Sequence, residues 1–579
     1  MPIQARIPRT LLLADAAWRL GPRALVHYGR HRLALASGQA ARRLTGAAAP
    51  EGRFLAELPS PPPPPLPGAW QARLRAALAV LPPARHHGPF DPAGPALGMD
   101  LFHPGDVRPV WEAGRLACLP KLAQAACLWP EEGHHAALEA RLTAWCAANP
   151  PFRGPHWACG QEAALRALHL ALALALLGQD GAPAPGARCF LALHARRIGA
   201  TSHYAQAQDN NHSISEPAGL CLRPAARRCR AARARRRRPC RRGAAGGAGW
   251  RLRPGFHRLP PAAAGCAVHR GMAAAPAWRP GLPRPFAERA AVAARWLAGL
   301  VAPDGALPRL GHQDGSAFAD LALAGPTDAR GSVERAMRLF AGASAGFAEE
   351  PGCDWLALPA APAFTPPASW RAAGSMGWRQ DGARALLRTG PLRFRPGQVD
   401  LLHFELWDGA TPLLTDAGTG AYNPAPADRW WLEYFSGAAA HNTITFDERE
   451  PMPRAGRFLH ARWPRLSALP DGAALRDANG HHHARRVSAE GRLWRVRDEV
   501  GGGFSTLALR WRLGPGAWRA TPEGATGPAR IRIEAEAPLA LRLEEGWESP
   551  AYGQVRRCTL LVARAAAPLR WIETEIGLG

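Results

Sequence analysis

The stretch from Arg395 to Asp447 constrains the fold most, because it combines short β-strand patterns with polar residues that an ordinary core would exclude. LLHFELW and TPLLTDAG are typical of two strands joined by Asp408-Gly409, a dipeptide that supplies the positive φ angles of a tight hairpin. HNTITFD indicates a third strand. We therefore expect β structure here.

Several polar side chains in this stretch are of the kinds that bind a divalent metal or an anionic substrate. They are Gln398, Asp400, His403, Asp416 and His441. Each could equally be an ordinary polar residue at a solvated strand end. Taken singly, the residues do not decide between the two interpretations.

Three motifs in this stretch, VDLLHFEL, LLTDAGT and AAAHNT, occur in an order that resembles the C-terminal half of the heparinase II/III-like polysaccharide lyases. The resemblance implies that Asp416 and His441 hold one structural divalent metal ion, zinc or calcium. His403 is a candidate catalytic base, and Gln398 and Asp400 are candidates for substrate binding. Gln398 stands where many relatives have a histidine, so the metal site is incomplete by the family pattern.

The N-terminal half has helical periodicity. QARLRAALAVL, HHAALEARLTAWCAAN and GQEAALRALHLALALALLG each place apolar residues at i, i+3, i+4 and i+7. Successive amphipathic helices with short connections predict an all-α array or toroid. NPPFRGPHWACGQEAALRAL also resembles the helical domain of the same lyases, which is an incomplete α/α toroid.

From about residue 370 the pattern changes to short alternating segments such as RLWRVRDEV, TLALRWRLG and ARIRIEAE, which predict an antiparallel β-sandwich with arginines facing solvent. The expected fold is therefore α+β and multidomain. Residues 1–69 form a helical segment with a Pro-rich spacer, residues 70–365 the toroid, and residues 366–579 the sandwich.

A second polar motif, AQAQDNNHSISEPAGL at residues 205–220, lies at the end of a predicted helix. Two amides beside an imidazole are suited to gripping a carboxylate. In the lyases that the chain resembles, this segment neutralises the uronate carboxylate, which implies catalytic roles for Asn211 and His212 and a substrate contact for Asn210. The alternative is an Asx-rich helix end without a ligand.

Residues 222–280 have a different composition, with sixteen arginines and no Asp or Glu. An Arg-rich arm that binds polyanions and a disordered linker are two interpretations. The third is translation out of frame. A one-base shift over residues 250–275 admits GGFAQDSTGYHRLLLDALSIAEWRR, which resembles the middle region of the lyases and contains a tyrosine. The family's catalytic tyrosine lies in that region, whereas this chain has none between Tyr204 and Tyr422.

The net charge of +26 would favour a nucleic-acid or polyanion partner. Lys121 is the only lysine, however, and the frame-shift hypothesis would remove sixteen of these charges, so nucleic acid is not the expected partner. No membrane-spanning segment is expected. Asp15 interrupts the first apolar run, so no clear signal peptide is expected either. The resemblance implies the cell envelope or periplasm, while the missing signal leaves the cytoplasm open.

The function expected from these features is β-elimination of an acidic, uronate-containing polysaccharide. This reaction removes the proton α to a carboxylate, and that proton becomes acidic enough only when the carboxylate charge is neutralised. Two alternatives stay open. One is a catalytically inactive glycan-binding relative of the lyases, and the other is a polyanion-binding protein that uses the Arg-rich run.

Overall fold

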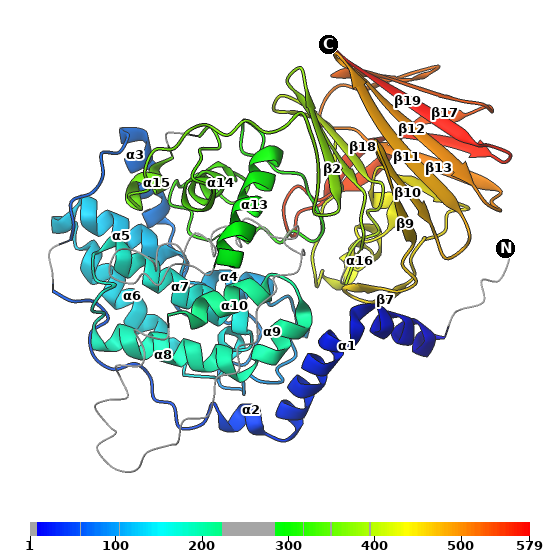
Figure 1. Ribbon diagram of the computed structural model, residues 1–579. Coiled ribbons are helices and arrows are strands. Elements are labelled where there is room, and N and C mark those ends of the chain that lie inside the picture. Colours follow the sequence, from blue (N-terminus) through cyan, green and yellow to red (C-terminus); the bar gives the residue numbers. More distant parts are fainter. Residues whose placement is uncertain are drawn as a thin grey trace. The chain divides into compact units, whose positions relative to one another are not determined.

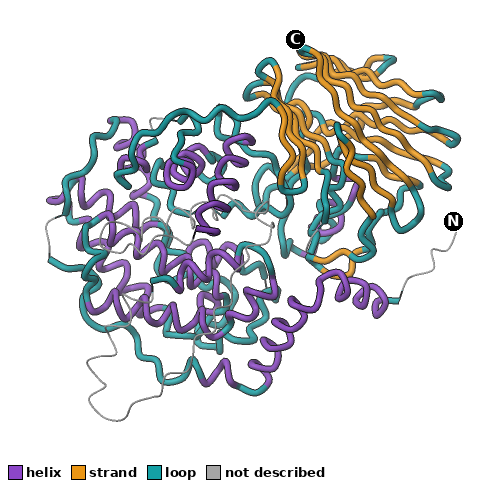
Figure 2. The backbone as a smooth tube through the Cα atoms, in the orientation of Figure 1, coloured by secondary structure: helices purple, strands orange, loops and turns teal. Residues whose placement is uncertain are grey.

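The computed structural model of the protein describes residues 8–57, 60–103, 105–222, 284–316, 318–347, 350–392 and 395–579. Figures 1 and 2 show that helices dominate the first half of the chain and strands the second. This order confirms the expected α+β fold class. The Arg-rich run and the hypothetical out-of-frame segment lie outside the described residues, apart from Leu222.

The chain divides into two compact units. The sheet unit comprises Met1–Pro22, Gly299–Gly315 and Pro366–Gly579, and the helical unit comprises Arg23–Ala298 and Ser316–Thr365. The first helix, α1 (Arg9–Ala36), is broken by non-helical backbone at Gly21, at the junction between the units.

Helices build the helical unit around a large apolar core and several smaller buried clusters. They are α2 (Gln39–Arg42), α3 (Gly68–Ala79), α4 (Arg108–Gly114), α5 (Cys118–Leu128), α6 (His134–Ala148), α7 (Gly160–Leu176), α8 (Pro185–Ala200), α9 (Ser202–Gln208), α10 (His212–Leu220), α13 (Arg284–Leu300), α14 (Arg330–Ala336) and α15 (Pro351–Trp355). The predicted helices in QARLRAALAVL, HHAALEARLTAWCAAN and GQEAALRALHLALALALLG are confirmed as α3, α6 and α7.

Helix α7 is the centre of this unit, because α5, α8 and α10 all pack against it. Nearly all of its residues are buried, including the charged Glu162 and Arg166, because neighbouring elements surround the helix. No helix in the described part of the chain is both long and apolar enough to cross a membrane.

Antiparallel sheets form the sheet unit. The five-stranded sheet has the order β1 (Ser369–Ala372), β2 (Ser375–Gln380), β3 (Ala383–Arg388), β4 (Phe404–Asp408), β5 (Thr411–Leu414). The eight-stranded sheet has the order β14 (Arg519–Thr521), β15 (Gly524–Thr526), β16 (Ala529–Ala535), β19 (Trp571–Leu578), β12 (Leu493–Gly501), β11 (His482–Glu490), β10 (Gly472–Arg476), β9 (Arg465–Leu469). The four-stranded sheet has the order β17 (Ala540–Glu548), β18 (Arg556–Ala566), β13 (Thr506–Arg512), β6 (Ile444–Phe446), and β7 (Arg454–Gly456) pairs with β8 (Leu459–His460).

One hydrophobic core joins the three larger sheets, with Phe404, Trp494 and Trp511 among its largest side chains. Along β16 the burial alternates, so that Ile531 is buried and Arg532 is exposed, as the sequence pattern predicts. The predicted hairpin is confirmed, because β4 and β5 pair across the turn at Asp408-Gly409. The third predicted strand, β6, pairs instead with β13 of another sheet.

Candidate functional site

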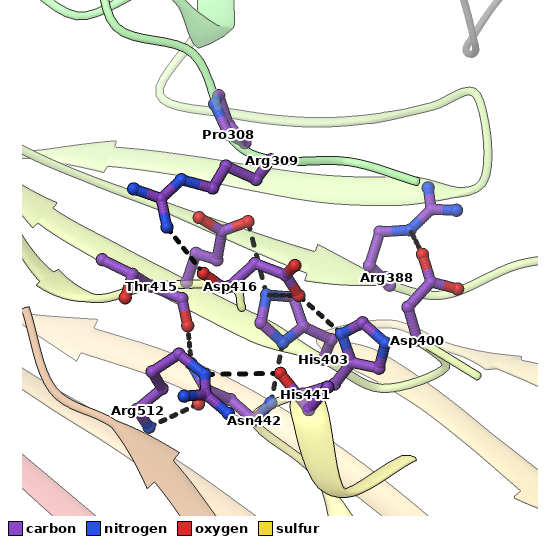
Figure 3. A network of polar contacts seen from close by, with 12 residues as sticks. Pro308, Arg309, Arg388, Asp400, His403, Thr415, Asp416, His441, Asn442 and Arg512 are labelled. Atoms are coloured by element: carbon purple, nitrogen blue, oxygen red, sulfur yellow. Dashed lines mark hydrogen bonds and ion pairs between the residues drawn. The ribbon is translucent and has the colours of Figure 1, made fainter. Parts of the chain in front are cut away.

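A cluster of buried polar side chains lies at the ends of three strands of the sheet unit (Figure 3). His403 directly precedes β4, Asp416 follows β5, and His441 lies between the 3-10 helix η6 (Ala438–Ala440) and β6. One potential ligand atom from each of these residues lies within 4.8 Å of the other two. We call these three residues the His-Asp-His centre.

Asp416 and His441 form the closest pair in the His-Asp-His centre. Nδ1 of His441 donates to Oδ2 of Asp416 at 2.5 Å, and the backbone N–H of Gly418 donates to Oδ1 at 2.7 Å. Burial alone raises the pKa of Asp416, but the charges of His441 and His403 and these hydrogen bonds hold the pKa well below its usual range. Burial lowers the pKa of His441, and Asp416 outweighs that effect and raises it.

His403 makes a hydrogen bond that fixes its tautomer. Its Nδ1 accepts the backbone N–H of Asn442 at 2.8 Å, so a neutral His403 carries its proton on Nε2. That Nε2 lies 3.3 Å from Oε1 of Glu405 and 3.5 Å from Oδ2 of Asp416. A general base needs a free lone pair that reaches the substrate, and His403 is only 1% exposed. The predicted role of His403 as a base therefore finds no support in this geometry.

Asn442 connects the strands around the His-Asp-His centre, a role that the sequence did not reveal. Its side-chain amide donates to the carbonyl oxygens of Phe404 and Thr415, at 2.8 and 3.0 Å, and its Oδ1 accepts the backbone N–H of Arg512 at 2.6 Å. The AHNT motif thus contributes a candidate ligand, His441, and the residue that ties β4, β5 and β13 together.

Gln398 and Asp400, the predicted substrate-binding residues, are buried beside the same strands. The amide of Gln398 donates to the carbonyl oxygens of Gly418, at 2.9 Å, and Phe435, at 3.2 Å. Asp400 accepts from Nε of Arg388 at 3.2 Å. These contacts hold the loops of the site, and the substrate-binding role of both residues stays a prediction.

A buried charged network supports the histidine-bearing segments from the eight-stranded sheet. Arg485 of β11 donates to the carbonyl oxygens of Leu402 and Asn442, each at 2.6 Å. Asp498 of β12 accepts from Arg485 at 2.7 Å and from His483 at 2.7 Å. Arg485 therefore hydrogen-bonds to the backbone of the residue before His403 and of the residue after His441.

The donor atoms of the His-Asp-His centre suit some metals better than others. One carboxylate oxygen and two imidazole nitrogens are typical zinc ligands, whereas calcium takes six to eight oxygens. Nε2 of His441 is buried and makes no hydrogen bond to any described residue, whereas the protonated Nε2 of His403 faces Oε1 of Glu405 at 3.3 Å. Asp416 and His441 therefore fit an ion, while Nε2 of His403 would first have to lose its proton.

The Asn-Asn-His motif lies in the helical unit, where Asn210 and Asn211 connect α9 to α10. Oδ1 of Asn210 accepts the backbone N–H of His212 at 3.1 Å, and the carbonyl oxygen of Asn211 accepts the hydroxyl of Ser215 at 3.0 Å. All three motif residues are half-buried. The structure thus brings the predicted residues of this motif together in one turn.

Glu216 is the partner that the sequence prediction left out of the Asn-Asn-His site. Its Oε1 accepts from Nδ1 of His212 at 2.9 Å, and the carboxylate is almost fully buried. Gly160 of α7 leaves the room for it, because a Cβ there would lie 2.8 Å from Oε2 of Glu216. The i, i+4 spacing of His212 and Glu216 on a helix is the sequence signal that could have revealed the pair.

The two sets of predicted residues therefore lie in different units. Asn210, Asn211 and His212 belong to the helical unit, and Gln398, Asp400, His403, Asp416 and His441 belong to the sheet unit. Within each unit the residues gather in one place.

Comparisons with known proteins agree with this architecture. Residues 364–571 match the family described as heparinase II/III-like, C-terminal. No curated protein sequence matches the chain. A solved heparinase III structure matches with a TM-score of 0.60 and 14% identity, over 96% of this chain and 91% of that one.

Two further solved structures have the same fold. A second heparinase III gives a TM-score of 0.53 at 14% identity, and a heparan sulfate lyase from Pedobacter heparinus gives 0.50 at 15% identity. Both alignments cover 99% of this chain and 93% of the other. Residues 364–571 thus belong to the heparinase II/III-like C-terminal family, and the chain as a whole has the helical-toroid and β-sandwich fold of the heparinase III structures.

Proposed function

We propose that this protein is a polysaccharide lyase that cleaves an acidic, uronate-containing glycan by β-elimination. The observation that carries the proposal is the His212–Glu216 pair beside Asn211, in a chain with the heparinase III fold. The similar protein from Pedobacter heparinus is a heparan sulfate lyase, which makes an acidic glycan the first substrate class to test.

Asn211 would neutralise the uronate carboxylate. Its side-chain amide makes no hydrogen bond within the described ranges, and the residue is half-buried at the start of α10. An amide donor directed at the carboxylate stabilises the extra negative charge that develops when the adjacent carbon loses its proton.

His212 is suited to take that proton. Because Nδ1–H donates to Glu216, Nε2 of the neutral ring carries the lone pair that a base needs. The C5 proton passes to Nε2, the bond between C4 and the glycosidic oxygen breaks, and a C4=C5 double bond forms. The departing oxygen keeps the electron pair of the broken bond and takes up a proton to become the new chain end.

Asp416 and His441 would hold a structural ion, for which zinc fits better than calcium. A bound zinc ion would supply a fixed positive charge that holds the ends of β5 and β6 together. The residues of the centre already pair without it, because His441 donates to Asp416. We further propose the cell envelope as the location, on the family resemblance, which fractionation of the producing cells would test.

The test is a lyase assay with heparan sulfate and alginate, following the ultraviolet absorbance of the unsaturated product. His212→Gln should reduce kcat/KM by about 10²- to 10⁴-fold, the usual contribution of a general base. His103→Gln is the matched control, because His103 is an exposed histidine of the same unit. Wild-type protein that binds the glycan but forms no unsaturated product would instead support the glycan-binding alternative.

A further inference from the structure

Helix α1 has an unusual distribution of polarity in the half that belongs to the helical unit, Arg23–Ala36. Three of its large aliphatic side chains face solvent, since Leu25, Val26 and Leu33 are 42%, 51% and 68% exposed. Positions 25, 29, 33 and 36 follow one another along a single helix face, and Val26 lies at its edge. This solvent-facing stripe is the apolar face of α1.

The opposite face of the same half packs against α9. Ala24 is buried, and Nδ1 of His27 lies 3.3 Å from Nδ1 of His203. The ring of His31 lies 4.9 Å from the ring of Tyr204. The helix therefore turns two imidazoles toward the protein and Leu25 and Leu33 toward solvent, the reverse of an ordinary surface helix.

Arginines surround the apolar face. Arg23, Arg30 and Arg32 are exposed, and residues 23–36 contain no Asp or Glu. By helical position, Arg32 lies beside Leu25, and Arg23 and Arg30 border the side of Val26. Arginine can lay its aliphatic stem along an apolar surface while its guanidinium reaches outward to a charged partner.

We propose that this half of α1 docks on an anionic lipid surface. An apolar stripe bordered by arginines, with no acidic residue, is the pattern of helices that lie in the headgroup region of a membrane. Leucine and valine would enter the acyl boundary, and the arginines would pair with lipid phosphates. A soluble polyanionic glycan would pair with the arginines but would leave the aliphatic side chains in water. The proposal is independent of the lyase activity.

The experiment is cosedimentation of the full chain with vesicles. Equal parts of phosphatidylglycerol and phosphatidylcholine provide the anionic surface, and phosphatidylcholine alone is the neutral comparison. Wild-type protein should sediment with the anionic vesicles and stay largely in solution with the neutral ones. The triple variant L25Q/V26Q/L33Q should bind at least about tenfold more weakly, because it removes the apolar contact without changing the charge.

Two further variants make the result specific. V80Q/V292Q changes two exposed valines elsewhere in the helical unit and should bind like the wild type. R30Q/R32Q leaves the aliphatic residues in place and should weaken binding roughly tenfold on the anionic vesicles. Circular dichroism should give the same helix content for all three variants.

Three outcomes would overturn the proposal. The first is the absence of wild-type sedimentation with anionic vesicles. The second is equal binding by the wild type and the triple variant, which would show attraction through charge alone. The third is a dimer in light scattering that the triple variant converts to a monomer, because the apolar face would then contact a second copy of the chain. Lyase activity on a soluble glycan should stay unchanged in all three variants, so failure here is distinguishable from failure of the proposed function.

Discussion

Single buried contacts decide the chemistry that each candidate residue can perform. His212 and His403 are both histidines in family-like motifs, but their hydrogen bonds leave them with opposite capacities. Glu216 accepts the Nδ1 proton of His212, which leaves a lone pair on Nε2. Asn442 donates to Nδ1 of His403, which leaves a proton on Nε2. Only the first arrangement leaves the Nε2 lone pair that the proposed base requires.

Glu216 should therefore act as a positioning residue for His212. Glu216→Gln keeps an oxygen that can accept the Nδ1 proton but removes the negative charge opposite the imidazolium. Hydrogen bonds to charged groups contribute about 1.5–3 kcal/mol, so kcat should fall roughly 10- to 100-fold while KM stays the same. Glu216→Ala should lose more, because His212 would also be free to change tautomer.

The control for this prediction is Glu288→Gln, which changes a glutamate in an exposed i, i+4 ion pair with Arg284. It should have wild-type kinetics. A rise in KM without a fall in kcat for Glu216→Gln would indicate that Glu216 contributes to binding and not to the orientation of the base.

The backbone conformation at position 418 requires a glycine. Its φ is +82°, and a Cβ there would collide with the carbonyl oxygen of Ser549. Gly418→Ala should lower the free energy of unfolding by roughly 2–4 kcal/mol, since a left-handed residue with a side chain costs about 1–2 kcal/mol before any clash. Gly491→Ala, at φ +57° with open space around it, should show only the smaller cost. Urea denaturation measures the free energy of unfolding of both variants. Equal losses of stability would mean that the contact between the new Cβ and the carbonyl oxygen of Ser549 is relieved without cost.

The elements differ in how far the sequence alone predicts them. Helices α3 and α6 and strands β12 and β16 follow from hydrophobic periodicity, because each element buries one face. Helix α7 and strand β13 are also where the sequence predicts them, but they are buried on nearly all sides, so that Arg512 of β13 is buried and does not face solvent as predicted. The sequence does not predict which strands share a sheet. β6 pairs with β13 across a large sequence separation, and local pattern carries no information about such pairing.

The site was predictable to a similar extent. Residue type and motif order single out Asp416 and His441, whose carboxylate and imidazole do pair in the structure. The tautomer of His403 depends on the direction of one backbone N–H, and the support from Arg485 comes from a strand more than forty residues away. Neither contact can be predicted from the spacing of residues in the sequence.

The Arg485–Asp498 network on β11 and β12 gives a prediction for pH dependence. Burial raises the pKa of Asp498, but the charge of Arg485 and hydrogen bonds from His483 and Arg485 outweigh it, so the pKa is lowered in the folded state. A depressed carboxyl pKa stabilises the fold fully above the unfolded value of about 3.9, and the stabilisation is lost as pH falls through the folded value.

Asp498→Asn should therefore flatten the loss of stability below about pH 4. At neutral pH it should cost roughly 3–5 kcal/mol, because Arg485 is left buried without a counter-charge. Thermal denaturation across pH measures both effects, and Asp471→Asn, at a partly exposed ion pair, is the control. If Asp498→Asn loses stability at acid pH as steeply as the wild type, protonation of other carboxylates causes the acid unfolding.

At the scale of the whole molecule, the path of the chain makes the sheet unit discontinuous. Residues Gly299–Gly315 belong to the sheet unit, although they begin at the last two residues of α13 and precede α14 of the helical unit. Within this segment, Nη1 of Arg309 donates to the carbonyl oxygen of Asp416 at 3.1 Å (Figure 3). It also donates to Glu548 at 3.0 Å. The backbone N–H of Gln313 donates to Thr419 at 2.8 Å. The region that matches the C-terminal family, residues 364–571, contains the acceptors of these hydrogen bonds but not the donors Arg309 and Gln313.

A fragment of residues 366–579 should consequently be less stable than the same region in the full chain. Arg309→Ala tests the reason, because it removes one of the two arginines that pair with the almost fully buried Glu548, together with the donor to the carbonyl oxygen of Asp416. It should cost about 1–3 kcal/mol. Arg284→Ala, at an ion pair that is 90% exposed on the arginine side, should cost less than about 1 kcal/mol. If Arg309→Ala and the fragment both unfold at the wild-type temperature, the sheet unit is complete without residues 299–315. If both are destabilised, the segment between α13 and α14 is part of the structure that holds Asp416 in place, and the C-terminal region cannot be studied faithfully without it.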